Sequence, residues 1–388
     1  MALATVATLV VAGAASLFMA WSIGAGSSGS TPFAPAVGAN AISVMRAGLV
    51  VGVLGLLGAV LQGANVTEAV GTELIGGVTL TATAAIVALV VAAVLVAAGV
   101  FAGYPIATAF TVTGAVVGVG LAMGGDPAWP KYAEILTLWV STPFVGGGAA
   151  YLVARALTGT RLPERALTAV LAGVVGAILA NVGFALLGPA GEQASVALVV
   201  AERAGVTPGV VTVAIAVVVA GAEYVDVTRD RAGAQRRFLL SMGGLVAFSA
   251  GGSQVGLAIG PLVPIFGDVG VSLVALLVGG GVGLLAGSWT GAPRMIKALA
   301  QDYASMGPRR SIAALIPSFA IAQTAVAFGI PVSFNEIIVS AIVGAGYAAG
   351  NAGVSRKKMG FTVLAWIGSL VGAFVLGFGV FSAVTWVI

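Results

Sequence analysis

Apolar stretches of about 20 residues, the length that crosses a bilayer as a helix, follow one another along this whole chain. Hardly a polar interval separates them. Only 8% of the 388 residues are charged, against about 25% in a soluble domain. So few charges could not cover the surface of a chain of this size in water. The sequence therefore predicts an all-α polytopic protein of the cell (plasma) membrane, surrounded by the lipid bilayer.

The apolar stretches predict about twelve transmembrane helices. We place them at 2–23, 47–66, 79–101, 105–124, 133–155, 165–187, 208–223, 237–250, 270–290, 311–329, 332–350 and 360–388. The first lacks a preceding basic region and a good cleavage site, which favours a span over a signal peptide. The stretches 105–124 and 332–350 could instead be re-entrant hairpins.

Basic residues predict the orientation of these spans, because cytoplasmic loops are enriched in Lys and Arg. With twelve spans, the basic loops all fall on one side, and the N-terminus lies outside. These loops include Arg161, Arg309 and Lys357. We interpret a further basic loop at 224–237 as an orientation signal, and the tryptophans, Trp139 and Trp366 among them, mostly as interfacial aromatics.

The chain contains no Cys and no His. This excludes disulfides, thiol catalysis, zinc sites of the Cys/His type and Ser-His-Asp triads. The 17 cations are spread along the chain and form no nucleic-acid footprint. We therefore expect no enzyme, no cofactor, no metal site and no nucleic-acid partner. The oligomeric state stays open, a homodimer included.

One fixed offset relates two parts of the chain. Aligning Ser27 with Ser253 gives a shift of 226 residues, and the same shift carries Pro105 onto Pro331. It also carries the glycine-rich run 114–120 onto 340–346. Three landmarks at one ungapped offset indicate a duplication.

The duplication predicts two repeats of opposite orientation, because five helices fall in each half and two lie between them. We divide the chain into a first transmembrane repeat at 1–160, connecting helices with a basic cytoplasmic loop at 161–235, and a second repeat at 236–388. Inverted-topology repeats with broken or re-entrant helices are typical of secondary transporters.

A polar, glycine-rich run interrupts the apolar pattern in each half, at 25–33 and at 251–261. Gly, Ser and Pro interrupt helices, and the freed backbone groups cannot face lipid, so they line a cavity inside the protein. A helix N-terminus opened in this way presents its positive dipole end to an anion. The alternative is that these small residues serve close helix packing.

These runs, and those that begin at Pro105 and Pro331, resemble the signatures of the inorganic phosphate transporter (PiT) family. That family has GANDVANA and PVSTTH elements, followed by a glycine-rich run, and the resemblance covers both halves. It implies an inorganic anion as the transported partner. This sequence departs from the pattern: the Asn-Asp pair becomes Ser27-Ser28 in one half and Ser253-Gln254 in the other. Both signature carboxylates are therefore missing.

The missing carboxylates favour sulfate over phosphate. Phosphate keeps a proton that a carboxylate can accept, whereas sulfate offers only acceptors and would be repelled by a buried carboxylate. The pattern also resembles the sulfate permease branch of the family. We therefore expect sulfate uptake by cation symport. Phosphate transport, sodium- or proton-coupled, and an anion channel on the same scaffold are the alternatives.

We expect one central anion site, built from hydroxyl and amide donors of both halves and from freed backbone N–H groups. The expected side chains are Ser27, Ser28, Thr31, Thr108, Ser253, Gln254 and Ser333. The expected backbone donors are Gly26, Gly29, Gly252 and Val255.

Glu336 is the candidate coupling residue, because it is an acidic residue within an apolar span and at a signature position. It could carry a proton, since burial favours the neutral carboxyl group, or it could bind sodium together with Asn335 and Ser333. We favour the proton. The alternative is a structural role, because Ser333 and Glu336 have the spacing of a helix capping box.

Overall fold

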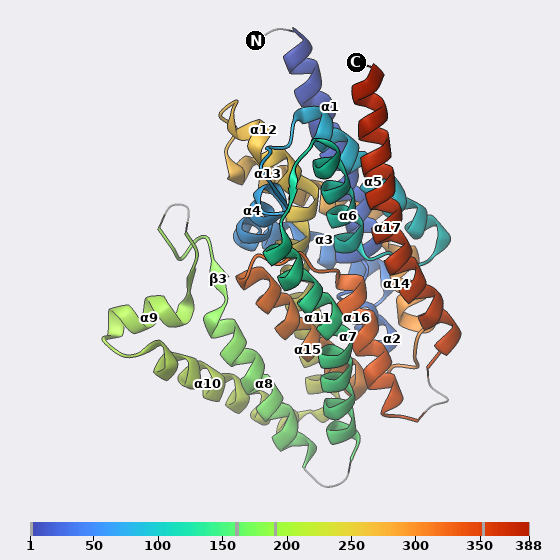
Figure 1. Ribbon diagram of the computed structural model, residues 1–388. Helices are drawn as coiled ribbons and strands as arrows, with labels where there is room; N and C mark the ends of the chain where they lie inside the picture. Colours follow the sequence, from blue (N-terminus) through green and yellow to red (C-terminus); the bar gives the residue numbers. More distant parts are fainter. Residues whose placement is uncertain (1–2, 160–162, 190–191, 351–353, 388) are drawn as a thin grey trace.

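The computed structural model describes residues 3–159, 163–189, 192–350 and 354–387. These residues are almost entirely helical (Figure 1). Ten of their helices are long and apolar enough to cross a membrane, and two shorter apolar helices accompany them. Each of the twelve predicted stretches coincides with one of these helices. The prediction of an all-α polytopic membrane protein is therefore confirmed.

The first part of the chain contains seven α-helices, a π-helical turn and two short strands. They are α1 (Leu3–Ile23), η1 (Gly24–Ser28), α2 (Ala34–Gly38), α3 (Val44–Gln62), α4 (Ala64–Thr72), β1 (Ile75–Gly76), α5 (Ala82–Ala102), α6 (Thr108–Ala122), β2 (Asp126–Pro127) and α7 (Trp129–Thr158). The strands β1 and β2 pair in antiparallel orientation.

Three helices and a two-stranded ladder follow, and the last part of the chain then repeats the first. The middle elements are α8 (Glu164–Asn181), β3 (Gly183–Phe184), β4 (Ala194–Ser195), α9 (Val196–Ala204) and α10 (Pro208–Arg229). The last are α11 (Arg231–Ile259), η2 (Gly260–Leu262), α12 (Val263–Gly267), α13 (Leu273–Thr290), α14 (Ala292–Gln301), α15 (Pro308–Ala327), α16 (Phe334–Tyr347) and α17 (Arg356–Val387).

The shift of 226 residues relates these elements as well as the sequence. Adding it to the first residues of α5 and α6 gives the first residues of α15 and α16. Figure 1 shows that α7 and α17, which correspond to each other, run in opposite directions. The three-way division of the chain stays a prediction. Its boundary at 160 lies outside the described residues, and its boundary at 235 lies inside α11.

The short helices α6 and α16 lie inside the bundle. They have 15 and 14 residues, so each is roughly 20 Å long, less than the ~30 Å hydrocarbon core. Pro105 and Pro331 precede them and restrict the residue before each to an extended conformation. The last helix of each half covers the short helix of the other half, because α17 packs along α6 and α7 along α16.

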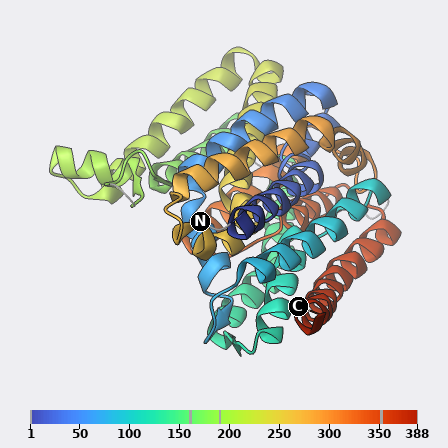
Figure 2. The same cartoon turned by 90° about the horizontal axis from the view of Figure 1, so that it is seen from above.

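The helices α8, α9 and α10 form an arm that lies to one side of the bundle (Figures 1 and 2). Glu164, at the start of α8, fastens the arm to the bundle. Its carboxylate accepts hydrogen bonds from Arg231 and Gln235 of α11 and pairs with Arg309 of α15, with Nη2 to Oε2 at 2.6 Å.

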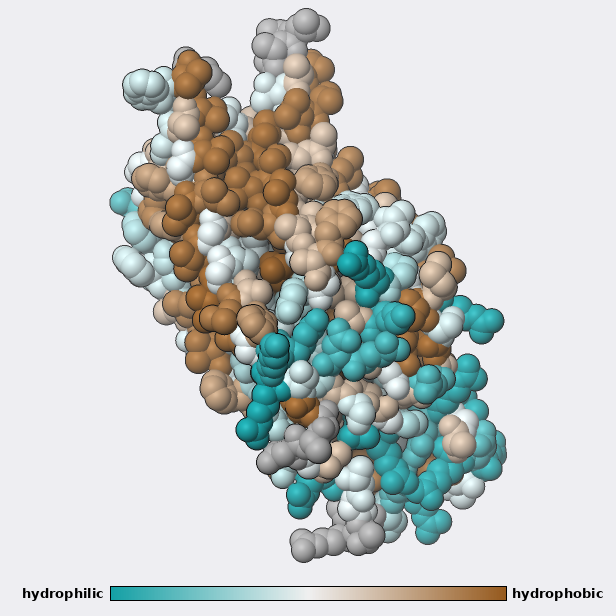
Figure 3. All heavy atoms as spheres, turned by 90° about the vertical axis from the view of Figure 1, so that its right-hand side faces the viewer, coloured by the Kyte–Doolittle hydropathy of each residue, from teal (hydrophilic) through white to brown (hydrophobic). Residues whose placement is uncertain are grey.

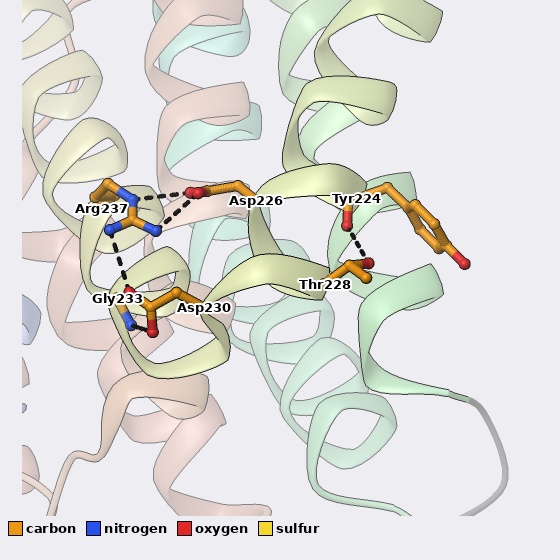
Figure 4. Close-up of polar contacts among 6 residues, drawn as sticks. All are labelled: Tyr224, Asp226, Thr228, Asp230, Gly233 and Arg237. Atoms are coloured by element: carbon orange, nitrogen blue, oxygen red, sulfur yellow. Dashed lines mark hydrogen bonds and ion pairs between the residues drawn. The ribbon is translucent and has the colours of Figure 1, made fainter.

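The prediction of a basic loop at 224–237 is wrong. These residues belong to α10 and α11, which are separated only by Asp230. Charged pairing stabilises this corner (Figure 4). Arg237 donates from Nη2 and Nε to the two Asp226 oxygens, at 2.7 and 2.9 Å, while Asp230 caps α11 at Gly233 N. Arg161, assigned to another basic loop, lies outside the described residues.

Hydrophobic side chains cover much of the face seen in Figure 3, and hydrophilic ones gather toward the end away from the chain termini. This distribution matches a membrane-embedded surface with a polar end. Inside the bundle, α11 and α15 are the most enclosed of the long helices. The core of the protein therefore lies around the helices that hold the polar runs.

Glycines let α3 approach α11 closely. A Cβ added at Gly251 would overlap the Gly55 carbonyl, and one added at Gly58 would overlap the Phe248 carbonyl. Gly279, inside α13, has nothing within 4 Å of its added Cβ. Gly251 and Gly58 are therefore needed for close helix packing, whereas Gly279 is not.

We expect Gly251→Ala to destabilise the protein by about 1–3 kcal/mol, because the helices must move apart. The matched control Gly279→Ala adds the same methyl group to a helix interior in open space and should stabilise by about 0.5–1 kcal/mol. Thermal unfolding in detergent measures both. Equal melting temperatures for the two variants would contradict this account of the α3–α11 contact.

Candidate anion-binding site

Eight polar side chains gather where η1, α6, α11 and α16 meet. They are Ser27, Ser28, Thr108, Ser253, Gln254, Ser333, Asn335 and Glu336, and each is at most 2% exposed. Three come from the first half of the chain and five from the second. The structure thus brings together most of the side chains that the sequence predicts for the site, in a position closed to solvent.

Gln254 of α11 joins the two halves at the centre of this cluster. Its Oε1 accepts hydrogen bonds from Thr108 Oγ1 at 2.7 Å and from Ser27 Oγ at 3.1 Å. Its Nε2 donates to the backbone carbonyl of Val332, just before α16. One amide therefore contacts the first turn of α6, the π-helical turn η1 and the segment that leads into α16.

Five atoms of the cluster have no hydrogen-bond partner among the described residues. They are Ser28 Oγ, Ser253 Oγ, Ser333 Oγ, Asn335 Oδ1 and Glu336 Oε2. Most buried polar atoms in proteins do have a partner. Unpartnered hydroxyl, amide and carboxylate atoms, all buried on elements that meet here, are what a polar ligand would satisfy.

The N-termini of α6 and α16 meet at the cluster. Asn335, in the first turn of α16, donates from Nδ2 to the Ile106 carbonyl at 2.6 Å and to the Gly26 carbonyl at 2.9 Å. No side chain caps the first turn of either helix. Both helices therefore direct uncapped N–H groups and positive dipole ends toward this place, an arrangement that favours an anion.

Two buried tryptophans hold the entrances of these short helices. Trp139 of α7 donates from Nε1 to the Pro331 carbonyl, and Trp366 of α17 donates to the Pro105 carbonyl, both at 2.8 Å. Trp139 also stacks on Phe110 of α6, with ring centroids 3.9 Å apart. The interpretation of these two residues as interfacial aromatics is wrong, since each is only 4% exposed. The two tryptophans are 227 residues apart, close to the repeat offset, and this spacing is the feature of the sequence that could have indicated a shared structural role.

In the second half the α-helix ends only at the last residues of the expected run, at the turn η2 that begins at Gly260, and not near Gly252. Helix α11 continues from Arg231 to Ile259, so Gly252 and Val255 lie inside it and their N–H groups belong to its backbone ladder. Packing accounts for this glycine, because a Cβ at Gly252 would lie 2.8 Å from Gln62 Cβ. The expectation that these two backbone groups are freed for an anion is therefore wrong.

The first half does depart from regular helix, but not as expected. Gly26 lies within the π-helical turn, where a Cβ would lie 2.6 Å from Val100 Cγ2, and Gly29 ends that turn against Gly24 and Ser288. Thr31 donates its hydroxyl to the Ser27 carbonyl at 3.0 Å. These three residues shape the turn, while the adjacent Ser27 and Ser28 enter the cluster.

Glu336 does not form the capping box that its spacing suggested. Ser333 precedes α16 as its N-cap residue, but its side chain makes no cap hydrogen bond. No group of three or more Asp or Glu residues that could hold a metal ion occurs in the described part of the chain. A cation at Glu336 would therefore depend on one carboxylate and neutral oxygens, of which Ser333 Oγ and Asn335 Oδ1 are unpartnered.

Known proteins share this sequence and this architecture. A protein of Pyrococcus furiosus named "Putative phosphate permease PF1020" is 25% identical over an alignment of 397 positions, which covers 94% of this chain and 93% of that protein. The chloroplastic inorganic phosphate transporter 2-1 of Arabidopsis thaliana is 24% identical, over 92% of this chain and 69% of its own length. A solved structure described as "The sodium-dependent phosphate transporter" superposes with a TM-score of 0.82 at 22% identity, covering 98% of this chain and 100% of the other, which shows a common fold.

The narrower resemblance to the sulfate permease branch finds no support among these proteins, whose names refer to phosphate. The model of the Phosphate transporter family matches residues 23–377, a range that contains the whole polar cluster. The chain therefore belongs to the phosphate transporter family.

Proposed function

We propose that the protein is a secondary transporter of inorganic phosphate that binds the anion at the buried cluster and is coupled to a cation. The observation that carries this proposal is the set of five unpartnered polar atoms on η1, α11 and the first turn of α16, the elements that meet at the N-termini of α6 and α16. Hydroxyl groups of Ser28, Ser253 and Ser333 supply donors, and the helix ends supply positive potential. Membership in the family and the names of the relatives support phosphate as the anion.

Glu336 favours phosphate over sulfate. The expectation of sulfate rested on a site without a carboxylate, but Glu336 stands unpartnered in the first turn of α16, beside Asn335. A carboxylate can accept the remaining proton of phosphate as a charge-assisted hydrogen bond. Sulfate has no proton to offer and would be repelled there.

Sulfate stays the second candidate because of two residues. Ser28 and Gln254 occupy the signature positions at which the family has carboxylates, and both can donate hydrogen bonds. If Glu336 is neutral when the anion binds, the site offers a proton-free dianion only donors and helix ends. The two candidates therefore differ in what they require of a single side chain.

A cation must accompany the anion, since moving a charge against the membrane potential costs about 2.3 kcal/mol per 100 mV. Ser333 Oγ, Asn335 Oδ1 and Glu336 Oε2 are unpartnered oxygens close together in sequence at the start of α16. Hard cations prefer oxygen ligands. We therefore propose sodium, and the structural neighbour, which is described as sodium-dependent, supports this choice. A proton on Glu336 is the alternative.

A carrier in the cell membrane fits the cluster better than a channel does. All eight of its side chains are almost completely buried, at 0–2% exposure. A conducting channel needs a continuous path, whereas alternating access passes through states in which the substrate is enclosed.

Calorimetric titration of the purified protein should show tighter binding of phosphate than of sulfate. In Glu336→Gln, we expect phosphate binding to weaken by about 10-fold or more, the effect of losing one charge-assisted hydrogen bond. Sulfate binding should stay equal or tighten, because a repulsive charge is removed. The control Glu134→Gln makes the same change at an exposed position of α7. A wild-type preference for sulfate would overturn the assignment of phosphate.

Uptake into proteoliposomes should require an inward sodium gradient. A proton gradient alone should not drive it. Glu336→Gln should abolish accumulation, while exchange of phosphate across the membrane continues because the anion donors remain. Glu134→Gln should accumulate phosphate like the wild type. Accumulation that follows only the pH gradient would favour the proton, and normal accumulation in Glu336→Gln would remove the coupling role of this residue.

A further inference from the structure

A cavity of about 860 Å³ lies between the bundle and the arm formed by α8 to α10. Its polar lining consists of amides and hydroxyls, and no charged side chain contributes to it. Gln62, Asn65 and Gln323 line it from the bundle, and Asn181, Gln193 and Thr212 from the arm side. The Gln193 Nε2 atom is buried and has no hydrogen-bond partner in the described residues.

The cavity lies toward the helix ends that are remote from the basic residues. Gln62 is the last residue of α3, which has Arg46 at its other end. Asn181 ends α8, which has Arg165 in its first turn, and Gln323 lies near the end of α15, which starts beside Arg309. If the basic ends face the cytoplasm, the cavity belongs to the opposite half of the protein.

A pair of glutamines forms the inner wall of the cavity. Gln62 Nε2 donates to Gln323 Oε1 at 3.3 Å, and Gln323 Nε2 donates back to Gln62 Oε1 at 3.2 Å. Gln323 Nε2 also donates to Ser249 Oγ of α11 at 2.6 Å. Gln62 Nε2 donates in addition to the Gly183 carbonyl at 3.0 Å, so the pair is anchored both on the helix that enters the anion site and on the segment after α8.

The anion site begins directly behind this pair. Gln62 packs on Gly252, where an added Cβ would lie 2.8 Å from Gln62 Cβ. Ser249 lies one helical turn before Ser253, whose hydroxyl is unpartnered in the cluster. The glutamine pair therefore stands between a polar cavity and the buried site.

We propose that this cavity is the vestibule through which the oxyanion reaches the site, and that the Gln62–Gln323 pair is its gate. The proposal rests on the proposed function of the cluster as an anion site. Amide and hydroxyl donors can replace part of the water around an anion, and without a fixed positive charge they release it again. When the two amides part, each gains free donors that can accompany the anion past Ser249.

The alternative is that these contacts are purely structural and that the two amides only hold α3 to α15, as polar side chains in membrane helices often do. In that case the pair stays closed during transport. The cavity would then have no connection with uptake. Chemical access to the pair distinguishes the two interpretations.

The natural absence of Cys allows single cysteines to report on access. We expect a small anionic methanethiosulfonate to modify Thr212→Cys in the cavity and Gln323→Cys at the gate. Saturating phosphate should slow modification of Gln323→Cys, and completed modification should reduce phosphate uptake at least 10-fold. Val371→Cys is the control. It lies on the outer face of α17, which meets lipid in the membrane, so the charged reagent should modify it slowly. A Gln323→Cys variant that stays unreactive, or that transports normally once modified, would overturn the gate.

A cross-link tests the same idea without relying on reagent access. In the double variant Gln62→Cys/Gln323→Cys, a short bis-methanethiosulfonate should join the two cysteines and stop uptake, and a reducing agent should restore it. Each single variant, treated in the same way, provides the control. Unchanged uptake after complete cross-linking, quantified by mass spectrometry, would show that the pair only holds the helices together.

Calorimetric phosphate binding by the same variants separates this proposal from the proposed function. If phosphate binds nowhere in the protein, the assignment of the anion site fails, whatever the labelling shows. If phosphate binds but neither modification nor cross-linking at the gate affects uptake, the site stands and the vestibule alone is rejected.

Discussion

Two helix N-termini face each other inside the membrane, and the rest of this structure depends on how they are stabilised. The first turns of α6 and α16 carry N–H groups without intrahelical partners, and both dipoles have their positive ends at the same place. In a low-dielectric interior such ends repel unless acceptors or an anion lie near them. Here Gln254 and Asn335 connect the surrounding carbonyls of Val332, Gly26 and Ile106. Neutral amides thus link the backbone segments around the two helix ends.

The exchange of long helices between the halves explains how this meeting point is positioned. Trp139 comes from the first half but bonds to the carbonyl of Pro331, and Trp366 comes from the second half but bonds to that of Pro105. Each short helix therefore begins against a helix of the opposite repeat. Any relative movement of α7 and α17 would be transmitted directly to the two helix N-termini, since packed interiors resist local deformation.

Hydropathy located every long helix, because burial in lipid demands apolar segments of fixed length. The repeat offset and the motif resemblance identified most of the cluster, from Ser27 to Glu336. Sequence reasoning failed where tertiary packing decides. Glycine costs a helix about 1 kcal/mol, which suggested a break at Gly252, yet α11 is continuous there, and close contact with Gln62 accounts for the glycine. The spacing of Ser333 and Glu336 suggested a capping box, but neither side chain is used in that way. Local patterns do not show which side chains a neighbouring helix will claim.

The two halves share a backbone plan but differ in their side chains at the site. The two helix ends therefore offer different groups to a ligand. At the repeat offset, Ala109 and Phe110 of α6 correspond to Asn335 and Glu336 of α16. Phe110 is occupied by stacking on Trp139, while Glu336 has no partner. The α6 end therefore offers a helix dipole and no carboxylate, which suits an anion, while the Thr108 hydroxyl is engaged by Gln254. The α16 end has the same dipole but adds a carboxylate and an amide oxygen, which can also bind a cation. An anion and a cation bound side by side would neutralise each other, so each makes the binding of the other more favourable.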